Sequence, residues 1–237
     1  MSLQQAVQQV MADVAEVGAL ARQAASGYER IFSNLRSVLG TAAAAAPSLA
    51  EAALGTMEIA DAAAAALFET FPGQPKYDCR SGCSPCCHLY VMVPPGIAAA
   101  IVDHLAAHVA PEDRGPLRER LQAAAAAAAA VDDPVRLRHR CPLLGPDDRC
   151  SVYAVRPLSC RAFTSTNVGR CRQVCLDANG SGMVDQNPSH FRIYAEATFA
   201  MEQAARARGS PADQLGLAQA LLDLMPPDDW RAPAHNP

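Results

Sequence analysis

The chain has 237 residues and a mass of 25.0 kDa, which suits one domain of ordinary size or two small ones. Half of the residues are hydrophobic but only 5% are aromatic, so alanine supplies much of the apolar content and favours helix. The formal net charge of -4 argues against a nucleic-acid binder. No bulky apolar run of about 18 residues is present, which excludes a transmembrane protein.

An amphipathic helix is predicted from residue 3 to about residue 39, because apolar residues such as Val14 recur at three- and four-residue steps. Gly27 is expected to weaken this helix and Gly40 to end it. A second helix should follow over residues 47–71. The apolar stripe of the first helix must be buried. Packing against the second helix as a hairpin is the default, and a homodimer interface is the alternative.

Further helices are predicted over residues 96–109, 111–131, 188–208 and 211–224. Between residues 136 and 182 no period lasts, which indicates loops and short turns, and the tail PPDDWRAPAHNP is expected to be disordered or loosely docked. The predicted fold is mainly α, with helices framing a loop-rich cysteine core that bound metal stabilises. Three parts are expected: a helical hairpin over 1–75, a metal-binding core with inserted helices over 76–182, and C-terminal helices and tail over 183–237.

The nine cysteines carry more information than the composition. An odd number leaves one thiol over in any fully paired disulfide scaffold. The N-terminal sequence lacks the basic start and continuous apolar region of a secretory signal peptide. We therefore expect a cytoplasmic protein, where clustered thiols are more often metal ligands than disulfides. A single lysine against nineteen arginines, with the alanine and proline content, suggests a GC-rich bacterial genome.

The first cysteine cluster is Cys79-Arg-Ser-Gly-Cys83-Ser-Pro-Cys86-Cys87. Loops of two or three residues let successive thiolates point at one centre, and glycine and proline supply the turns. Cys86 and Cys87 are adjacent, and neighbouring side chains are expected to diverge. This predicts that the two thiolates bind different metal ions, so that the chain holds more than one metal equivalent.

The second cluster is spread over a longer segment. It comprises Cys141, Cys150 and Cys160, followed by Cys171 and Cys175. Between residues 136 and 172 eight arginines face only two acidic residues, Asp147 and Asp148. Guanidinium groups there would offset the negative charge of thiolates and lower their pKa values. The alternative is a basic loop that contacts a nucleic acid or an acidic partner, although the interleaved aromatics needed for base stacking are missing.

The alternative to metal binding is that the cysteines are small buried hydrophobic residues. Their spacing in predicted loops, away from apolar helix positions, argues against that interpretation. Zinc and iron remain open, because closed zinc sites and iron–sulfur clusters, including the 4Fe-4S type, take four thiolates in similar runs. His88 directly follows the first cluster and is a ligand or a donor to a ligand, or else a packing residue.

The CxxxCxxCC run, Cys141-Pro-Leu-Leu, Cys150-Ser-Val-Tyr and Arg156-Pro157-Leu-Ser-Cys160-Arg together resemble a family of zinc- or iron-chelating domains often called YkgJ-like. The resemblance covers about residues 77 to 172 and implies a small cytosolic bacterial metalloprotein. Its presumed ligands are Cys79, Cys83, Cys86, Cys87, Cys141, Cys150 and Cys160.

The outer positions of the pattern fit less closely. Cys171 falls where relatives often carry a further cysteine, so we count it with the ligands, whereas Cys175 is either an added ligand or a resolving thiol. Relatives often show a threonine and a glutamate at the start of a helix where Pro94-Pro95-Gly96 stands here.

Three functions remain open. The chain is a metal-binding or chaperone module, an iron or iron–sulfur enzyme of protein modification or electron transfer, as in relatives linked to flagellin lysine methylation, or a thiol redox switch. Metal ions are the expected partners, and no membrane or nucleic acid is expected. His104 and His108, four residues apart on a predicted helix, have a spacing that can bind zinc but no third ligand nearby.

Overall fold

The computed structural model describes residues 3–71, 73, 75–80, 82–177 and 182–225. Within them the chain is mainly helical, which confirms the predicted fold class. The α-helices are α1 (Leu3–Ala45), α2 (Leu49–Thr70), α3 (Ile97–His108), α4 (Pro111–Ala129), α5 (Leu158–Ala162), α6 (Val168–Leu176), α7 (Pro188–Ala207) and α8 (Leu217–Leu224). The shorter elements are the 3-10 turns η1 (Pro85–His88), η2 (Pro134–Arg136) and η3 (Tyr153–Val155) and the strands β1 (Met92–Val93) and β2 (Leu215–Gly216).

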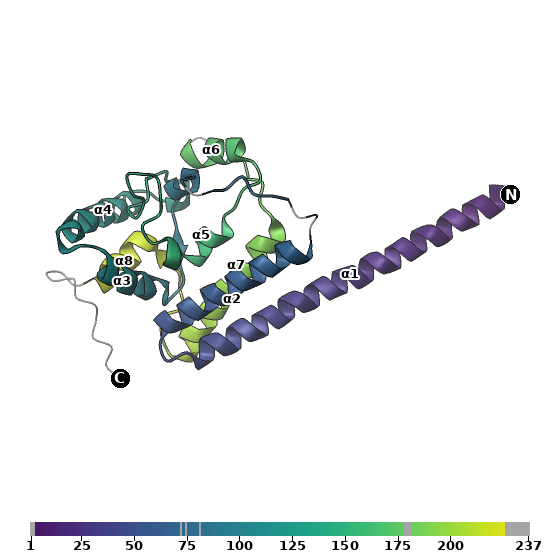
Figure 1. The fold of residues 1–237 in the computed structure, drawn as a ribbon, viewed down its shortest axis with the longest axis horizontal. Helices are drawn as coiled ribbons and strands as arrows, with labels where there is room; N and C mark the ends of the chain where they lie inside the picture. Colours follow the sequence, from purple (N-terminus) through teal and green to yellow (C-terminus); the bar gives the residue numbers. More distant parts are fainter. Residues whose placement is uncertain (1–2, 72, 74, 81, 178–181, 226–237) are drawn as a thin grey trace.

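Helices α1, α2 and α7 pack side by side, and the N-terminal half of α1 projects beyond them (Figure 1). The prediction that Gly40 ends α1 is wrong, since the helix continues for another turn and ends at Ala45. Pro47 follows closely, and proline disfavours helical geometry in the residue before it. The Ser48 hydroxyl then accepts a hydrogen bond from the Glu51 N–H at 3.2 Å and caps the start of α2.

Helices α3, α4 and α8 cover the other end of the molecule, where β1 pairs with β2 in an antiparallel two-stranded sheet. The turn before α3 requires glycine at position 96, because its φ is +88° and a Cβ there would lie 2.2 Å from the Leu49 carbonyl oxygen. The predicted helix over 211–224 begins later, at Leu217. The preceding residues pair with β1 instead.

The described part of the segment from residue 136 to residue 182 is largely loop and turn, as predicted, but it also contains α5 and α6. These helices have 5 and 9 residues, too few for an apolar period to emerge. A capping signal for α6 is present in the sequence: the Asn167 side chain accepts a hydrogen bond from the Arg170 N–H at 2.9 Å.

The core lies between the helices and consists mainly of alanine, leucine, isoleucine and valine. Its few large aromatic members include Phe32 on α1 and Tyr194 on α7. No helix in the described part of the chain combines the length and apolarity needed to cross a membrane. The tail PPDDWRAPAHNP begins at residue 226 and lies outside the described residues.

Candidate metal centre

One cavity of about 610 Å³ gathers seven cysteines from separate parts of the chain. The other lining residues include Met92, Tyr153, Phe163, Gln214 and Leu217. The cysteines come from the loop before η1, from η1 itself, from the turn after residue 140 and from α5; they are Cys79, Cys83, Cys86, Cys87, Cys141, Cys150 and Cys160. These are the seven residues that the family resemblance implies as ligands.

The first cluster is shaped by two local turns. The Cys83 N–H donates to the Arg80 carbonyl at 2.9 Å, and Gly82 within this turn has a φ of +80°, which favours glycine. Pro85 then opens η1, which carries Cys86 and Cys87. The loop is tied to the segment that follows α5, because the Ser165 N–H donates to the Cys79 sulfur at 3.3 Å.

The second cluster is positioned against the first by the backbone. The Cys141 N–H donates to the Cys87 carbonyl at 2.7 Å, so these two cysteines lie on neighbouring segments. A tight turn closed by a hydrogen bond from the Gly145 N–H to the Arg149 carbonyl, 2.8 Å, returns the chain and presents Cys150. Cys160 lies in α5, which begins immediately after Pro157.

Cys86 and Cys87 do not diverge, so that premise of the sequence analysis is wrong. Their thiols share a hydrogen bond, because the tight 3-10 turn aims both side chains toward the same cavity. The hydrogen bond from the Cys87 thiol favours a Cys86 thiolate and lowers the pKa of Cys86 to about 7. The same hydrogen bond, followed by burial, raises the pKa of Cys87.

Burial raises the pKa of most other thiols that line the cavity. For Cys141 the pKa rises to about 11. The neighbouring thiols add to the effect, since each thiolate would repel the next. Without metal, Cys86 is therefore the cavity cysteine that ionises most readily, and the other thiols of the cavity stay protonated.

Arg156 is the arginine that faces these thiols most directly. Its guanidinium lies 4.8 Å above the Tyr153 ring, and its Nε is buried with no hydrogen-bond partner among the described residues. Burial raises the pKa values of Cys150 and Cys160, and the Arg156 charge partly opposes this rise; the same charge helps to lower the pKa of Cys86. A buried donor without an acceptor, on a residue that lines the cavity with the thiols, suits a site that becomes anionic when the thiols ionise.

Most of the other arginines of this segment already have partners. Arg140 pairs with Asp148 at 2.9 Å, and Arg138 donates to backbone carbonyls, including that of Val174 at 3.3 Å. The expected counter-charge role is therefore concentrated on Arg156. Arg172 contributes less, because it only partly opposes the rise that burial causes in the pKa of Cys83.

Cys171 and Cys175 lie beside the cavity without lining it. They are buried, one helical turn apart on α6, with their sulfurs 3.7 Å from each other. Cys86 packs against this pair and so stands between it and the cavity. The predicted ligand set is thus brought together except for Cys171 and Cys175.

None of the described histidines lines the cysteine cavity. His88 faces a different, polar hollow together with Arg172, and its Nδ1 lies 3.2 Å from the Ser84 carbonyl oxygen. The His104 and His108 rings stack with their centroids 4.1 Å apart.

A buried polar network joins α5 to α2 and α7, and no sequence pattern predicted it. Arg161 donates to the Asp61 carboxylate of α2, to the Arg156 carbonyl at 2.7 Å and to the Ala154 carbonyl at 2.6 Å. Tyr194 of α7 donates to the same carboxylate at 2.7 Å. A signal for it exists, because Asp61 is the only polar residue between positions 59 and 67 of an alanine-rich helix.

The thiols share a cavity, but their sulfurs are not gathered around one centre. Across the residues that the structure describes, no group of three or more His, Cys, Asp or Glu side chains forms a metal site as it stands. The donor set still fits zinc or iron, since thiolate sulfur is a preferred ligand of both. Binding would have to pull the loops inward and release protons.

Comparison with known proteins agrees with this chemistry. Residues 78–176 match the model of the CxxCxxCC family, described as "Putative zinc- or iron-chelating domain". The match spans all nine cysteines and leaves α1, α2, α7 and α8 outside it. No curated protein and no solved structure matches the chain.

Proposed function

We propose that the chain is a metal-binding protein that coordinates zinc or iron through the thiols of its cysteine cavity. The observation that carries the proposal is the convergence of seven cysteines from four separate segments on one cavity. Chance burial of small apolar side chains would scatter them through the core, whereas only Cys141 and Cys150 of the seven pack against the main core. The ligands we propose are Cys79, Cys83, Cys86, Cys87, Cys141, Cys150 and Cys160.

We propose more than one metal equivalent. A closed tetrahedral site takes four thiolates, and seven exceed that number. Cys86 and Cys87 face the same cavity from adjacent positions, so one of them can serve each of two neighbouring ions. Bound metal would keep the thiolates ionised and hold four chain segments together, which ties metal binding to the stability of this region.

The test is the metal content of the protein purified without oxygen, measured on the same sample as its visible absorption. A colourless protein with about two zinc ions per chain supports a structural or storage site. A brown protein with iron and acid-labile sulfide supports an iron–sulfur centre. A folded protein with neither metal would overturn the proposal.

Two variants sharpen this measurement. Cys160→Ala removes a cavity thiol, and we expect it to lower the metal content. Cys175→Ala removes a thiol that lies outside the cavity, and we expect it to retain the wild-type content. Equal loss in both variants would contradict the ligand assignment.

A second candidate function is a thiol redox switch, favoured by the 3.7 Å contact between the Cys171 and Cys175 sulfurs. The hydrogen bond from Cys171 lowers the pKa of Cys175, which favours the nucleophilic thiolate. Exchange with a small-molecule disulfide would join the two sulfurs and release two small thiols. After such treatment, mass spectrometry should find a Cys171–Cys175 disulfide, and free thiols at both positions would exclude the switch.

A further inference from the structure

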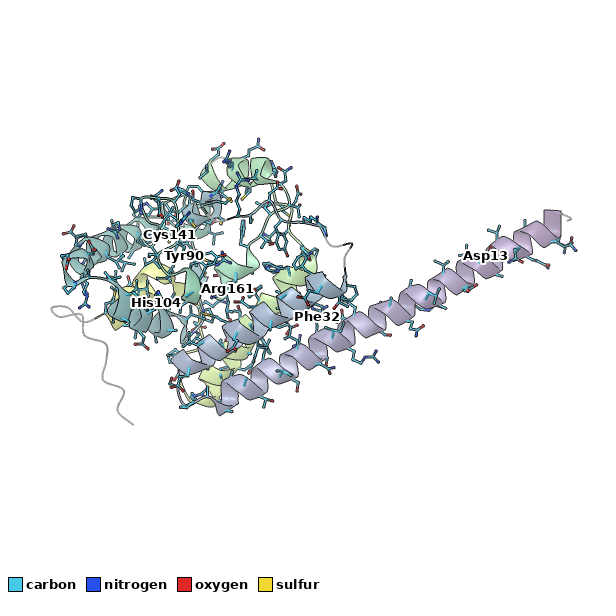
Figure 2. The ribbon with its side chains drawn as sticks, in the orientation of Figure 1. Asp13, Phe32, Tyr90, His104, Cys141 and Arg161 are labelled. Atoms are coloured by element: carbon cyan, nitrogen blue, oxygen red, sulfur yellow. The ribbon has the colours of Figure 1, made fainter. Side chains whose placement is uncertain are left out.

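The N-terminal part of α1 carries an apolar stripe that nothing in the described chain covers. Helix α1 leaves the body of the molecule near Tyr28, whose hydroxyl donates to Ser189 of α7, and it projects from there to its N-terminus (Figure 1). Asp13 lies on this projecting part, far from Cys141 (Figure 2). The stripe comprises six large apolar side chains that are 50% to 68% exposed: Val7, Val10, Met11, Val14, Val17 and Leu20.

The spacing of the stripe indicates a helical partner. Val7, Val10, Val14 and Val17 are followed at the same alternating three- and four-residue steps by alanines at 21 and 24. We call these six residues the seam. They repeat every 3.5 residues, the period that keeps one side of a helix facing another helix in a left-handed supercoil. The projecting helix gains little from its own surface, where the Gln9–Asp13 hydrogen bond of 2.8 Å is among the few side-chain contacts.

A membrane surface is a poor match for this stripe. Helices that lie on anionic bilayers carry lysine and arginine on their polar face. Here no lysine or arginine occurs before Arg22, and the polar face holds glutamines with Asp13 and Glu16.

The positions that flank the seam favour a second copy of the same chain. Heteromeric coiled coils select their partner through complementary charges at these positions. In this helix they are occupied by Met11, Asp13, Gly18 and Leu20, with a single charge among them. Nothing there repels an identical helix, and nothing there specifies a different one.

The body of the molecule sets the direction of pairing. From Tyr28 onward α1 packs against α2 and α7: Tyr28 and Leu35, which continue the spacing of the seam, contact the core, and Arg192 of α7 pairs with Glu29 at 2.6 Å. A parallel partner would bring its own helical body to this occupied end. In an antiparallel pair, the N-terminus of the partner's α1 reaches only to the point where α2 and α7 of the first copy begin to cover its helix. The partner's other helices then lie beyond the N-terminus of the first copy.

We propose that the chain forms an antiparallel dimer through residues 7–24 of α1. Val14 of one copy then lies opposite Val17 of the other at the centre of a two-fold interface, and Val7 lies opposite the alanine at position 24. Every seam residue between 7 and 24 has a seam residue as its partner in this register. The Met11 side chain of one copy meets the Gly18 of the other, where the missing Cβ leaves room.

The test is the molar mass of the full chain by light scattering during size-exclusion chromatography. We expect twice the chain mass of 25.0 kDa. The double variant Val10→Asp/Val17→Asp should run at the mass of one chain. The matched control Ala12→Asp/Ala19→Asp adds the same charges to the opposite, exposed face of the same helix and should remain dimeric. Equal metal content in all three proteins shows that the substitutions leave the body folded.

Small-angle scattering separates the two directions of pairing. An antiparallel dimer holds two bodies apart and gives a pair-distance distribution with two maxima. A single maximum at dimeric mass would overturn the antiparallel arrangement. A wild-type protein that stays at the mass of one chain, or one that sediments with anionic phospholipid vesicles as a single chain, would overturn the dimer itself. Neither result bears on the metal content, so this proposal and the proposed function fail separately.

Discussion

The Arg161 guanidinium donates a hydrogen bond to the Asp61 carboxylate, a residue one hundred positions earlier in the chain. Arg161 is 8% exposed and directly follows Cys160, whereas Asp61 lies on the long helix α2. The same side chain also holds the Arg156 and Ala154 carbonyls. This contact therefore fixes the position of a cavity cysteine on the helical body.

Replacing Asp61 with alanine should destabilise the protein by about 2 kcal/mol, because it leaves a buried guanidinium without its charged partner. Urea unfolding of the metal-loaded protein measures the loss. Glu58→Ala is the matched control, since it removes an exposed carboxylate from the same helix. If the two variants lost the same stability, the contact would have no special role in holding α5.

Replacing Arg156 with glutamine should weaken metal retention about tenfold, the scale of losing a group that supports metal ligands. The charge that favours the Cys86, Cys150 and Cys160 thiolates would be absent. Competition with a coloured chelator measures the affinity. Arg149→Gln is the control, because Arg149 also lines the cavity but already pairs with Asp147 at 3.8 Å. An equal loss of metal affinity in both variants would mean that only the net charge around the cavity matters, and not the position of Arg156.

In the metal-free protein, Cys86 should be alkylated first at a pH near 7. Its pKa is lowered to about 7 by the hydrogen bond from Cys87, whereas burial raises the pKa of Cys141 to about 11. The thiolate is the reacting form, so a brief iodoacetamide treatment followed by peptide mass spectrometry reads the order directly. A Cys87→Ala variant should slow the labelling of Cys86. Unchanged labelling in that variant would show that the hydrogen bond does not activate Cys86.

The metal-free protein should lose stability between pH 9 and about pH 11. Burial raises the pKa of Cys141 from its ordinary value of 9.0 to about 11, so the folded state keeps a proton that the unfolded chain releases. This stabilisation is complete below pH 9 and is lost as the pH rises through about 11. Cys86 has the opposite sign, with a loss as the pH falls toward about 7.

Urea unfolding of the metal-free protein across this range measures the slope. Cys141→Ala should show a shallower fall than the wild type above pH 9, since one of the protonated thiols is gone. A stability that does not change between pH 9 and 11 would mean that these thiols are solvated in the folded state.

Local sequence patterns predict the helical class, the position of most helices and the cysteine chemistry. These features are local, because helix periodicity, alanine content and short Cys spacings act between residues close in the chain. Local patterns do not reveal α5 and α6, which are too short to show a period. They also place the end of α1 too early, because a single glycine costs a long helix too little to end it.

Which cysteines share a cavity depends instead on contacts between distant segments. The Cys141 N–H bonds to the Cys87 carbonyl and Asp61 holds the residue after Cys160, and both contacts join segments that are far apart in the sequence. The same packing places Cys171 and Cys175 on α6 beside the cavity and turns the Cys86 and Cys87 thiols toward the same cavity. It also leaves the first turns of α1 without a neighbouring helix. Long-range contacts depend on how whole helices pack, and no local pattern encodes that.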